Sequence, residues 1–489
     1  MDPRKEQLIG IVGGENVLDD HLTLEAYAKD HSFVLPIKPW FVVKPKSMTE
    51  VQGLVEWANE TSTPLVPVSS GPPHFHGDTV PSVPGAVIVE LFLMNHILNI
   101  DRRNKMVVVE PGVTYGQLER ELAKEGLRVT MPLLPRGNKS VVASLLERQP
   151  TTVPRYNYSL TEPLRDCGVV WGNGEITYTG EAGNLSYSLE EQWRAGEMQV
   201  DPKGPAQTDF FRLLTGAQGS MGIVVWASIK CELLPSIRKL FFIPAEKLED
   251  LIDLSYQIQR LRLGDEVLLV NNSQLVNMLG KNDDRIRALK EGVPSWALII
   301  GIAGRALFPV EKVDVQEKDI GDLAQQFGLK LQSEIPGITD NEMLEVILNP
   351  SDEPYWKLKY KGACQDIFFL TTLDKIPQYL KTMYSVANAF EYPASEIGVY
   401  IQPQHHGVEH HCEFNLPFDP KDAKETAKVK EIYSKASQEV IGQGAYFARP
   451  YGIWANMVFN RDAQSTIALK KIKRVFDPNN VMNPGKLCF

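Results

Sequence analysis

The chain has 489 residues and a formal net charge of -10, with 43% hydrophobic and 23% charged residues, which is ordinary for a globular protein. Because one core rarely grows to this size, we predict two or more domains of roughly 100–250 residues each. The acidic balance argues against nucleic acid as a partner, since phosphate binding requires a basic surface.

The five cysteines are scattered and form no C-x-x-C pair. This pattern argues against a thiolate zinc or iron–sulfur site within the chain and favours a reducing compartment. The first residues do not have the apolar core of a signal peptide. No run of about 18 apolar residues predicts a membrane span. We therefore expect a cytoplasmic protein.

Strands and helices alternate over roughly the first 125 residues, after a helical lead-in. Strands are predicted at 41–43, in "TPLVPVSS" and in "AVIVELFLMN". Ser47 to Glu50 has capping-box spacing and begins an amphipathic helix. "NKMVVVEPGVTYGQLERELAKEGL" is predicted to form a strand, a turn and a helix. The alternation indicates an α/β or α+β domain.

The middle of the chain is richer in strands. "CGVVWGNGEITYTG" is predicted to be a hairpin that turns at Asn173-Gly174, and 209–235 to be a glycine loop followed by an apolar strand. Residues 238–430 fit a mostly antiparallel sheet with helices on one face. The tail, 431–489, begins as a helix and ends in "VFDPNNVMNPGKLCF".

Three separated loops carry small residues at strand ends: Ser69–Asp78, Asn138–Ser144 and Thr215–Gly222. Glycine allows close approach of the backbone, and successive N–H groups form a cradle for a pyrophosphate. We interpret the three loops as backbone donors around one large polar ligand. Neither a G-x-G-x-x-G after the first strand nor a P-loop is present, so a nucleotide-like ligand would be held in another way.

Four blocks in this order resemble one family: "PWFVVKPKSMTEVQGLVEWANETSTPLVPVSSG", "VVVEPGVTYGQLERELAKEGL", "LLTGAQGSMGIVVWASIKCELLP" and "FDPNNVMNPGK". The chain is similar to the vanillyl-alcohol oxidase/p-cresol methylhydroxylase (VAO/PCMH) superfamily of FAD enzymes. The resemblance implies an α+β fold with a PCMH-type FAD-binding domain of two subdomains. An antiparallel-sheet cap domain then covers the substrate, and the C-terminus returns to the FAD domain. The domains that we expect are 1–37, 38–237, 238–440 and 441–489.

The resemblance implies FAD as the cofactor, bound by the three loops and the closing "NPGK". The residues expected to bind it are Ser69, Ser70, Gly71, His74, Gly77, Asp78, Ser140, Ser144, Gly219, Gly222, Ile223, Asn483 and Lys486. Two features depart from the family: Pro72-Pro73 interrupts the first loop, and the second loop has few glycines. Some members link FAD covalently through a histidine of the first loop. A bond through His74 therefore stays open beside a simple hydrogen bond from His74 to phosphate.

Four of the nine histidines fall in "QPQHHGVEHHCEF". Relatives that oxidise 2-hydroxy acids carry a histidine metal site in the cap domain, but the spacing here differs and the glycine-rich core of that motif is absent. We expect no metal. Neutral histidine is a general base, so we expect His406 or His411 to face the substrate. The alternative is a hairpin with solvated imidazoles.

A cluster near the C-terminus surrounds one cation with aromatic side chains. Tyr446, Arg449, Tyr451 and Trp454 all lie in "GAYFARPYGIWANMVFNR". The resemblance implies that a tyrosine and an arginine here bind a phenolate, or that the arginine binds the carboxylate of a 2-hydroxy acid. A fixed guanidinium neutralises an oxyanion in either case. The alternative is an arginine stacked on a tyrosine at the surface.

The resemblance therefore implies an FAD-dependent oxidoreductase that transfers a hydride from a small hydroxylated substrate to flavin N5. A phenolic alcohol or alkylphenol is favoured. The alternatives are a 2-hydroxy-acid dehydrogenase and a non-catalytic FAD-holding subunit. No haem or iron–sulfur cluster motif is present, so a dehydrogenase would need a separate electron-acceptor protein. Assembly into a homo-oligomer stays open. The expected catalytic residues are Arg449, Tyr446, Tyr451, His406 and His411.

Overall fold

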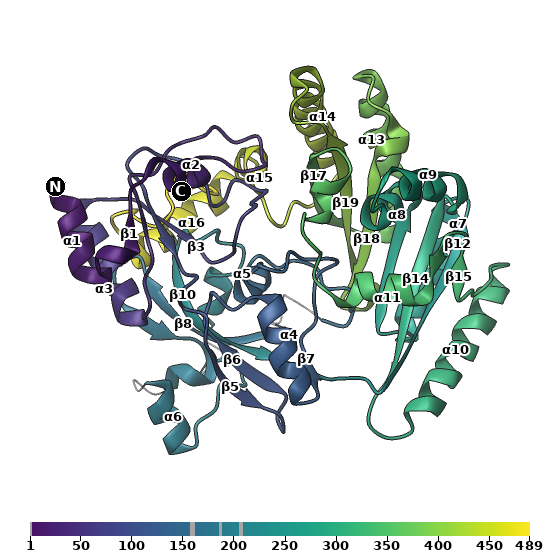
Figure 1. Cartoon of the computed structure of the whole chain (residues 1–489), viewed down its shortest axis with the longest axis horizontal. Coiled ribbons are helices and arrows are strands. Elements are labelled where there is room, and N and C mark those ends of the chain that lie inside the picture. The colour runs from purple at the N-terminus through teal and green to yellow at the C-terminus, as the bar shows by residue number, and fades with distance from the viewer. Residues whose placement is uncertain (1, 157–161, 185–187, 205–208) are drawn as a thin grey trace.

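The computed structural model describes residues 2–156, 162–184, 188–204 and 209–489. Figure 1 shows two lobes side by side, with both chain termini in the same lobe. The first lobe contains strands β1–β11 and the C-terminal helices α15 (Ile453–Phe459) and α16 (Ala463–Phe476). The second lobe contains strands β12–β19 and helices α7–α14. The chain therefore leaves the first lobe once and returns to it at the end.

A four-stranded sheet begins the first lobe. Its order is β1 (Val17–Leu18), β2 (Phe41–Val43), β4 (Val87–Glu90) and β3 (Leu65–Val68), with β2, β4 and β3 parallel. Helices α1 (Pro3–Val12) and α3 (Met48–Thr61) pack on one face and α2 (His21–Ala28) on the other. The Ser47 hydroxyl accepts the Glu50 N–H at 3.2 Å, which confirms the predicted cap of α3.

A five-stranded antiparallel sheet completes the first lobe. Its order is β5 (Ile97–Asp101), β6 (Met106–Val109), β10 (Gly222–Lys230), β8 (Leu164–Trp171) and β9 (Ile176–Tyr178). One face packs on α4 (Tyr115–Lys124) and α5 (Val141–Leu146), and the other shares a core with α3. The predicted hairpin at Asn173-Gly174 is present as the β8–β9 turn. Helix α6 (Leu189–Ala195) and the small pair β7 (Leu127–Arg128) and β11 (Glu232–Leu233) lie at the edges.

The second lobe is built on a six-stranded, fully antiparallel sheet. Its order is β12 (Ile237–Ala245), β14 (Trp296–Gly304), β13 (Glu266–Asn271), β18 (Gly398–Gln404), β19 (Glu409–Phe418) and β17 (Ala363–Thr371). The small hairpin β15 (Glu334–Ile335) and β16 (Ile338–Thr339) lies beside β12. The antiparallel sheet that the sequence predicts is therefore present.

The prediction that helices cover one face of this sheet is wrong. One face packs against α7 (Glu249–Arg260), α10 (Pro309–Gln326), α13 (Ile376–Ala389) and α14 (Ala423–Gly442). The opposite face packs against α8 (Asn272–Leu279), α9 (Asp283–Gly292), α11 (Asp340–Leu348) and α12 (Trp356–Lys359). The strands are apolar on both faces because alternate residues, such as Leu268 and Leu269, enter the two cores.

The C-terminal segment holds together two distant parts of the first lobe. Met482 pairs with Leu65 beside β3, through backbone hydrogen bonds of 2.7 and 2.8 Å. The buried Lys473 ammonium donates to the carbonyls of Ser220 and Met482 and pairs with Asp477. The chain end thereby holds the glycine loop before β10 against the strand that precedes the first loop.

Charged side chains join the two lobes beside β7 and β13. Arg128 donates to Glu266 at 2.9 Å, and Arg238 donates to the same carboxylate at 3.0 Å. Arg305 bridges Asp265 at 2.6 Å and Glu232 at 3.3 Å. These groups are mostly buried, so the cluster fixes how the second lobe sits on the first.

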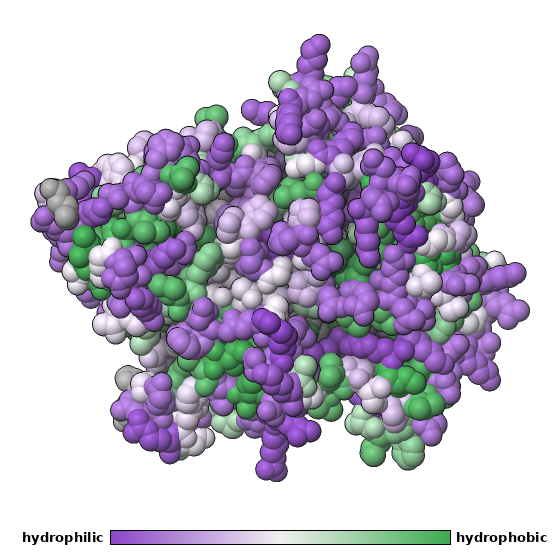
Figure 2. Space-filling view, in the orientation of Figure 1, coloured by the Kyte–Doolittle hydropathy of each residue, from purple (hydrophilic) through white to green (hydrophobic). Residues whose placement is uncertain are grey.

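The face in Figure 2 is mostly hydrophilic, with apolar side chains in scattered patches. Within the described ranges, no helix has the length and apolarity that crossing a bilayer requires.

We expect Glu266→Gln to lower the free energy of unfolding by about 3 kcal/mol, because two buried guanidiniums lose their shared charge. Burial opposes the charge of Glu266, but Arg128 and Arg238 hold its pKa at about 2, below the ordinary 4.5. This contribution is therefore present above pH 4.5 and is lost as the pH falls toward 2. Urea unfolding at several pH values measures it, and the variant should show less acid sensitivity than the wild type.

The matched control is Glu317→Gln, which breaks a pair with Lys239 in which both side chains are more than a third exposed. Its effect should stay below about 1 kcal/mol. Equal effects of the two substitutions would contradict the role given to the cluster between the lobes.

Candidate functional site

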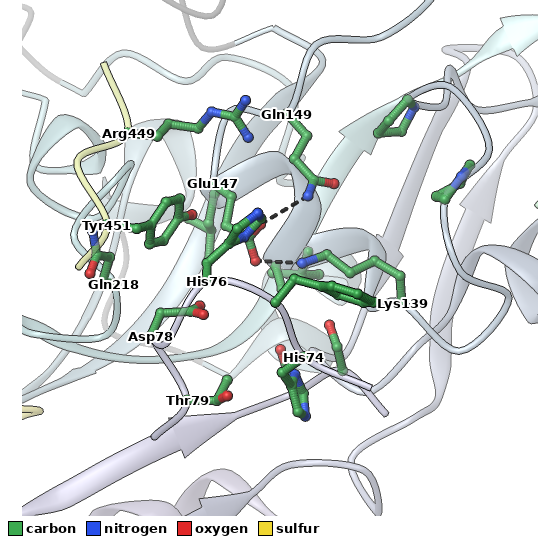
Figure 3. Close-up of a pocket in the computed structure, with 18 of the residues that line it drawn as sticks. His74, His76, Asp78, Thr79, Lys139, Glu147, Gln149, Gln218, Arg449 and Tyr451 are labelled. Atoms are coloured by element: carbon green, nitrogen blue, oxygen red, sulfur yellow. Dashed lines mark hydrogen bonds and ion pairs between the residues drawn. The ribbon is translucent and has the colours of Figure 1, made fainter. Parts of the chain in front are cut away.

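A large cavity opens between the two lobes and encloses about 1710 Å³ of empty space, part of it open to solvent. Its first-lobe wall consists of residues after β3, residues 132–150 and the loop before β10. Its second-lobe wall comes from α8, α12, β17, β18 and β19, and Arg449 and Tyr451 close it. In Figure 3, Arg449 and His74 lie at opposite ends of the group, with His76 and Glu147 between them.

The first loop is held from outside the cavity. The Lys486 ammonium donates to the carbonyls of Gly77 and Val80 at 2.6 and 2.7 Å. The Asn483 side chain donates to the carbonyls of Asp78 and Gln218. The closing "NPGK" therefore joins the first loop to the loop before β10, and neither Asn483 nor Lys486 lines the cavity.

Two glycines of the first loop are packed against other residues of the chain, which leave no room for a side chain. A Cβ on Gly77, whose φ is +75°, would lie 2.5 Å from a methyl group of Val34. A Cβ on Gly71 would lie 2.5 Å from the side-chain nitrogen of Asn138. Neither glycine lines the cavity, so the close contacts that require them are with the chain itself.

Backbone donors nevertheless remain available for a ligand. Among the described residues, the N–H groups of Ser70, Phe75, His76 and Asp78 have no hydrogen-bond acceptor, and all four residues line the cavity. The buried His74 Nε2 also has no partner. Burial, with Arg136 and Lys139 nearby, lowers the pKa of His74 to about 3, so its ring is neutral. These donors fit the phosphates of a dinucleotide such as FAD.

Arg449 is a buried cation for which the described residues provide no anionic partner. Its side chain is 7% exposed, and its guanidinium lies 4.1 Å from the Phe368 ring centroid. In the part of the chain that the structure describes, no carboxylate lies within 4.0 Å of it. His76 stacks on Tyr451 with ring centroids 4.6 Å apart and meets the edge of Phe368. This end of the cavity is therefore aromatic and positively charged.

A buried ionic network lies on the second-lobe wall. The Lys357 ammonium contacts Asp366 at 2.6 Å and Glu413 at 2.8 Å, and His411 contacts Glu413 at 3.0 Å. Burial opposes the charge of Lys357, but the two carboxylates hold its pKa well above the ordinary value. His76 Nε2 lies 3.9 Å from Asp366, so the network reaches the first loop.

Two carboxyl groups meet on the first-lobe wall. Glu147 pairs with Lys139 at 2.5 Å (Figure 3). Burial opposes its charge, but Lys139 and His76 keep the pKa of Glu147 below the ordinary value. Burial and the charge of Glu147 raise the pKa of Asp78. Asp78 is therefore the carboxyl of this pair that more readily holds a proton.

The structure brings some of the predicted residues together in the cavity and not others. Those that line it are Ser69, Ser70, His74, Asp78, Gly219, Gly222, Ile223, Arg449 and Tyr451. Ser140 and Ser144 lie behind it: Ser140 caps α5, and Ser144 bonds Gln149. Together with Gly71, Gly77, Asn483 and Lys486, they support the cavity wall from outside.

The aromatic box predicted around Arg449 differs in its members. Tyr446 is 61% exposed and lies outside the cavity, while Trp454 packs in the core and donates to Ser437. Phe368 takes their place because β17 directs it toward the guanidinium. Residues 446–451 form no helix or regular strand, so a sequence pattern does not reveal that Tyr451 is buried while Tyr446 is exposed.

The four histidines of the cluster separate widely. His405 and His406 form a turn in the left-handed region, with φ of 47° and 53°, and His406 donates its N–H to Pro154. His410 is buried on the other face of β19, beside Tyr256. Only His411 adjoins a cavity residue, through Phe368 and Glu413. Among the described residues, no group of three or more histidine, cysteine or acidic side chains is placed to hold a metal.

Sequence reasoning missed several charged residues of the cavity. These are Arg136, Lys139, Glu147, Lys357 and Asp366. One signal was present: Asp366 lies directly before the apolar "IFFL" segment and within the predicted strand region, and a charge within a buried strand is costly unless it has a partner. The other four residues lie in segments of ordinary polar sequence. Only their positions in the structure show that they line the cavity.

Comparison with known proteins gives the family. Residues 39–178 match the model "FAD binding domain", and residues 369–487 match "FAD linked oxidases, C-terminal domain". The flavoprotein subunit of 4-cresol dehydrogenase [hydroxylating] from Pseudomonas putida is 22% identical over 97% of this chain and 93% of its own. D-2-hydroxyglutarate dehydrogenase from Stutzerimonas stutzeri (strain A1501) is 22% identical over 99% of this chain and 98% of its own.

The crystal structure of p-cresol methylhydroxylase with substrate bound is similar to this one with a TM-score of 0.84 at 20% identity, over 99% of this chain and 96% of that one. The α+β FAD-binding domain and the antiparallel-sheet domain that the sequence predicts are confirmed by this similarity and by the two family models. The chain belongs to the FAD-linked oxidases of the VAO/PCMH superfamily.

Proposed function

We propose that this FAD-linked oxidoreductase acts on a small phenolic substrate, an alkylphenol or a phenolic alcohol, and that Arg449 binds its phenolate oxygen. The observation that carries the proposal is the buried guanidinium of Arg449, which lacks a carboxylate partner among the described residues. A buried charge is costly unless it is paired, so the site favours an anionic ligand.

The walls around Arg449 favour an aromatic ligand. Phe368 and Tyr451 line the cavity beside Arg449, where an aromatic ring would find stacking partners. Burial raises the pKa of the Tyr451 hydroxyl well above its ordinary value, with the charge of Glu147 adding to the effect. Tyr451 therefore stays protonated and donates a hydrogen bond to the same oxygen. The similarity to 4-cresol dehydrogenase supports this substrate class.

FAD, when bound, supplies the acceptor for a hydride at its N5. The chain supplies the binding, orientation and proton chemistry. Arg449 and Tyr451 stabilise the negative charge of the substrate oxygen, which favours loss of its proton. We assign that proton to His76, which lines the cavity against Tyr451 and has Asp366 at 3.9 Å to stabilise its charged form. His411 does not line the cavity, and its ring centroid lies 5.8 Å from that of Phe368.

A second candidate is oxidation of a 2-hydroxy acid. The guanidinium of Arg449 lines the cavity and would pair with the carboxylate of such an acid as it would with a phenolate. The similarity to D-2-hydroxyglutarate dehydrogenase supports this reading.

The FAD of the purified protein should give an absorbance band between about 350 and 500 nm that bleaches under anaerobic addition of a phenolic donor. A panel of alkylphenols, phenolic alcohols and 2-hydroxy acids sorts the two candidates. Bleaching by hydroxy acids alone would overturn the phenolic substrate, and a flavoprotein inert to the whole panel would indicate a subunit that only holds FAD. Acid precipitation tests for a covalent bond, because covalently bound flavin stays in the pellet.

Arg449→Met should lower kcat/KM by about 10²–10³-fold, because the developing phenolate loses its counter-charge, while the flavin band stays. Stopped-flow reduction of the flavin measures this effect. The matched control is Arg474→Met on the exposed side of α16, which should leave the rate within about twofold. Normal turnover of Arg449→Met would show that the oxyanion binds elsewhere.

His76→Gln should lower kcat by about 10²-fold, because the proton acceptor is gone. The measurement is the rate of flavin reduction with a saturating donor. His411→Gln should have a much smaller effect, because His411 does not line the cavity. A larger loss of rate in the His411 variant than in the His76 variant would move the proton acceptor to His411.

A further inference from the structure

We propose that Arg136 is the counter-ion of the FAD diphosphate, in place of part of the glycine cradle that the second loop lacks. The inference rests on the proposed function only in requiring that FAD occupies the cavity. It concerns the end of the cavity opposite Arg449.

Five of the eight acidic and basic side chains that line the cavity are paired with one another; among the described residues, Asp78, Arg136 and Arg449 have no ion-pair partner. The eight are Arg136, Lys139, Lys357, Arg449, Asp78, Glu147, Asp366 and Glu413. Lys139 pairs with Glu147, and Lys357 pairs with both Asp366 and Glu413. In the described part of the chain, neither Arg136 nor Arg449 has a carboxylate within 4.0 Å. The cavity thus holds two guanidiniums for anions that the protein does not provide.

Arg136 lies where the first and second loops meet. Its side chain is 7% exposed, and it donates one hydrogen bond to the carbonyl of Gly71. The guanidinium carbon lies 5.9 Å from the Phe75 ring centroid. A guanidinium has five N–H groups, so one bond to Gly71 leaves most of them for a ligand.

The same end of the cavity offers further donors to an anion. The backbone N–H groups of Ser70 and Phe75 have no acceptor among the described residues, and the buried Nε2 of His74 has no partner. The charge of Arg136 contributes to the lowered pKa of His74, so the two side chains lie close together. A cation, a neutral imidazole and free backbone donors around one space suit a diphosphate.

The sequence of the second loop makes the arginine necessary. "RGNKSVVAS" has a single glycine, Gly137, which limits how closely its backbone can approach a phosphate. A guanidinium that reaches across from this loop replaces backbone contacts with a charged, two-pronged hydrogen bond. Burial lowers the pKa of Arg136, because it disfavours the charged form of the guanidinium. A bound anion beside it would stabilise that charge.

The competing explanation is that Arg136 only braces the first loop through Gly71. The two explanations differ in what the bound ligand must carry. A counter-ion affects ligands with a diphosphate and makes their binding depend on salt, since added ions screen the attraction. A brace affects flavins with and without phosphate equally.

The experiment uses full-length apoprotein from a riboflavin-starved host, titrated with FAD and with riboflavin at several salt concentrations. Arg136→Met should raise the Kd for FAD by about 10–100-fold and flatten its salt dependence. Riboflavin, which has no phosphate, should bind the variant as it binds the wild type. Arg136→Lys keeps the charge, so its Kd for FAD should fall between those of the wild type and Arg136→Met. Arg474→Met, on the exposed side of α16, should leave the Kd for FAD within about twofold. Thermal melting of each apoprotein checks folding.

Unchanged FAD affinity in Arg136→Met would overturn the inference. So would weaker binding with the wild-type salt dependence, because that result identifies a brace. If Arg136→Met does not fold, the salt dependence of Arg136→Lys against Arg136→Gln decides in the same way. A wild-type apoprotein that binds no FAD would instead contradict the proposed function.

Discussion

Two buried guanidiniums, which have no carboxylate partner among the described residues, determine how the cavity can be used. Placing Arg136 and Arg449 between the lobes is costly in the absence of anions. Glu147, Asp366 and Glu413 are already engaged by Lys139 and Lys357, and burial together with the charge of Glu147 raises the pKa of Asp78. The two cations lie on different walls, one beside the first loop and one beside Phe368. A dinucleotide diphosphate and a substrate oxyanion would satisfy them separately, so the cavity charge pattern agrees with one large anionic cofactor and one small anionic substrate.

That arrangement depends on contacts between segments far apart in the chain. Lys486 and Asn483 hold the first loop and the loop before β10, and Lys473 holds the helix that precedes them. The lobes are in turn joined by Arg128 and Glu266. The cavity walls are therefore fixed by buried polar side chains that make several hydrogen bonds each, which places the ligand-lining residues with little freedom.

Local patterns predicted much of the fold. The cap of α3, the hairpin at Asn173-Gly174 and the antiparallel character of the second sheet follow from short-range rules of spacing, turn chemistry and alternation. The same patterns failed where long-range packing decides. Leu268 and Leu269 are both apolar, which a sheet covered on two faces requires, yet the sequence does not show how many helices cover each face.

The sequence by itself determined the family, the glycine loops and the presence of Arg449 in an aromatic segment, because the order of motifs and the residue types are properties of the chain alone. Only the tertiary structure decided which charges are paired. It separated Tyr446 from Arg449, brought Phe368 beside that guanidinium, and left Gly71 and Gly77 against Asn138 and Val34. The physical reason is that the folded chain decides which charges meet, whether they are 8 residues apart, as Lys139 and Glu147 are, or 138 apart, as Arg128 and Glu266 are. Burial then sets the energy of each pairing.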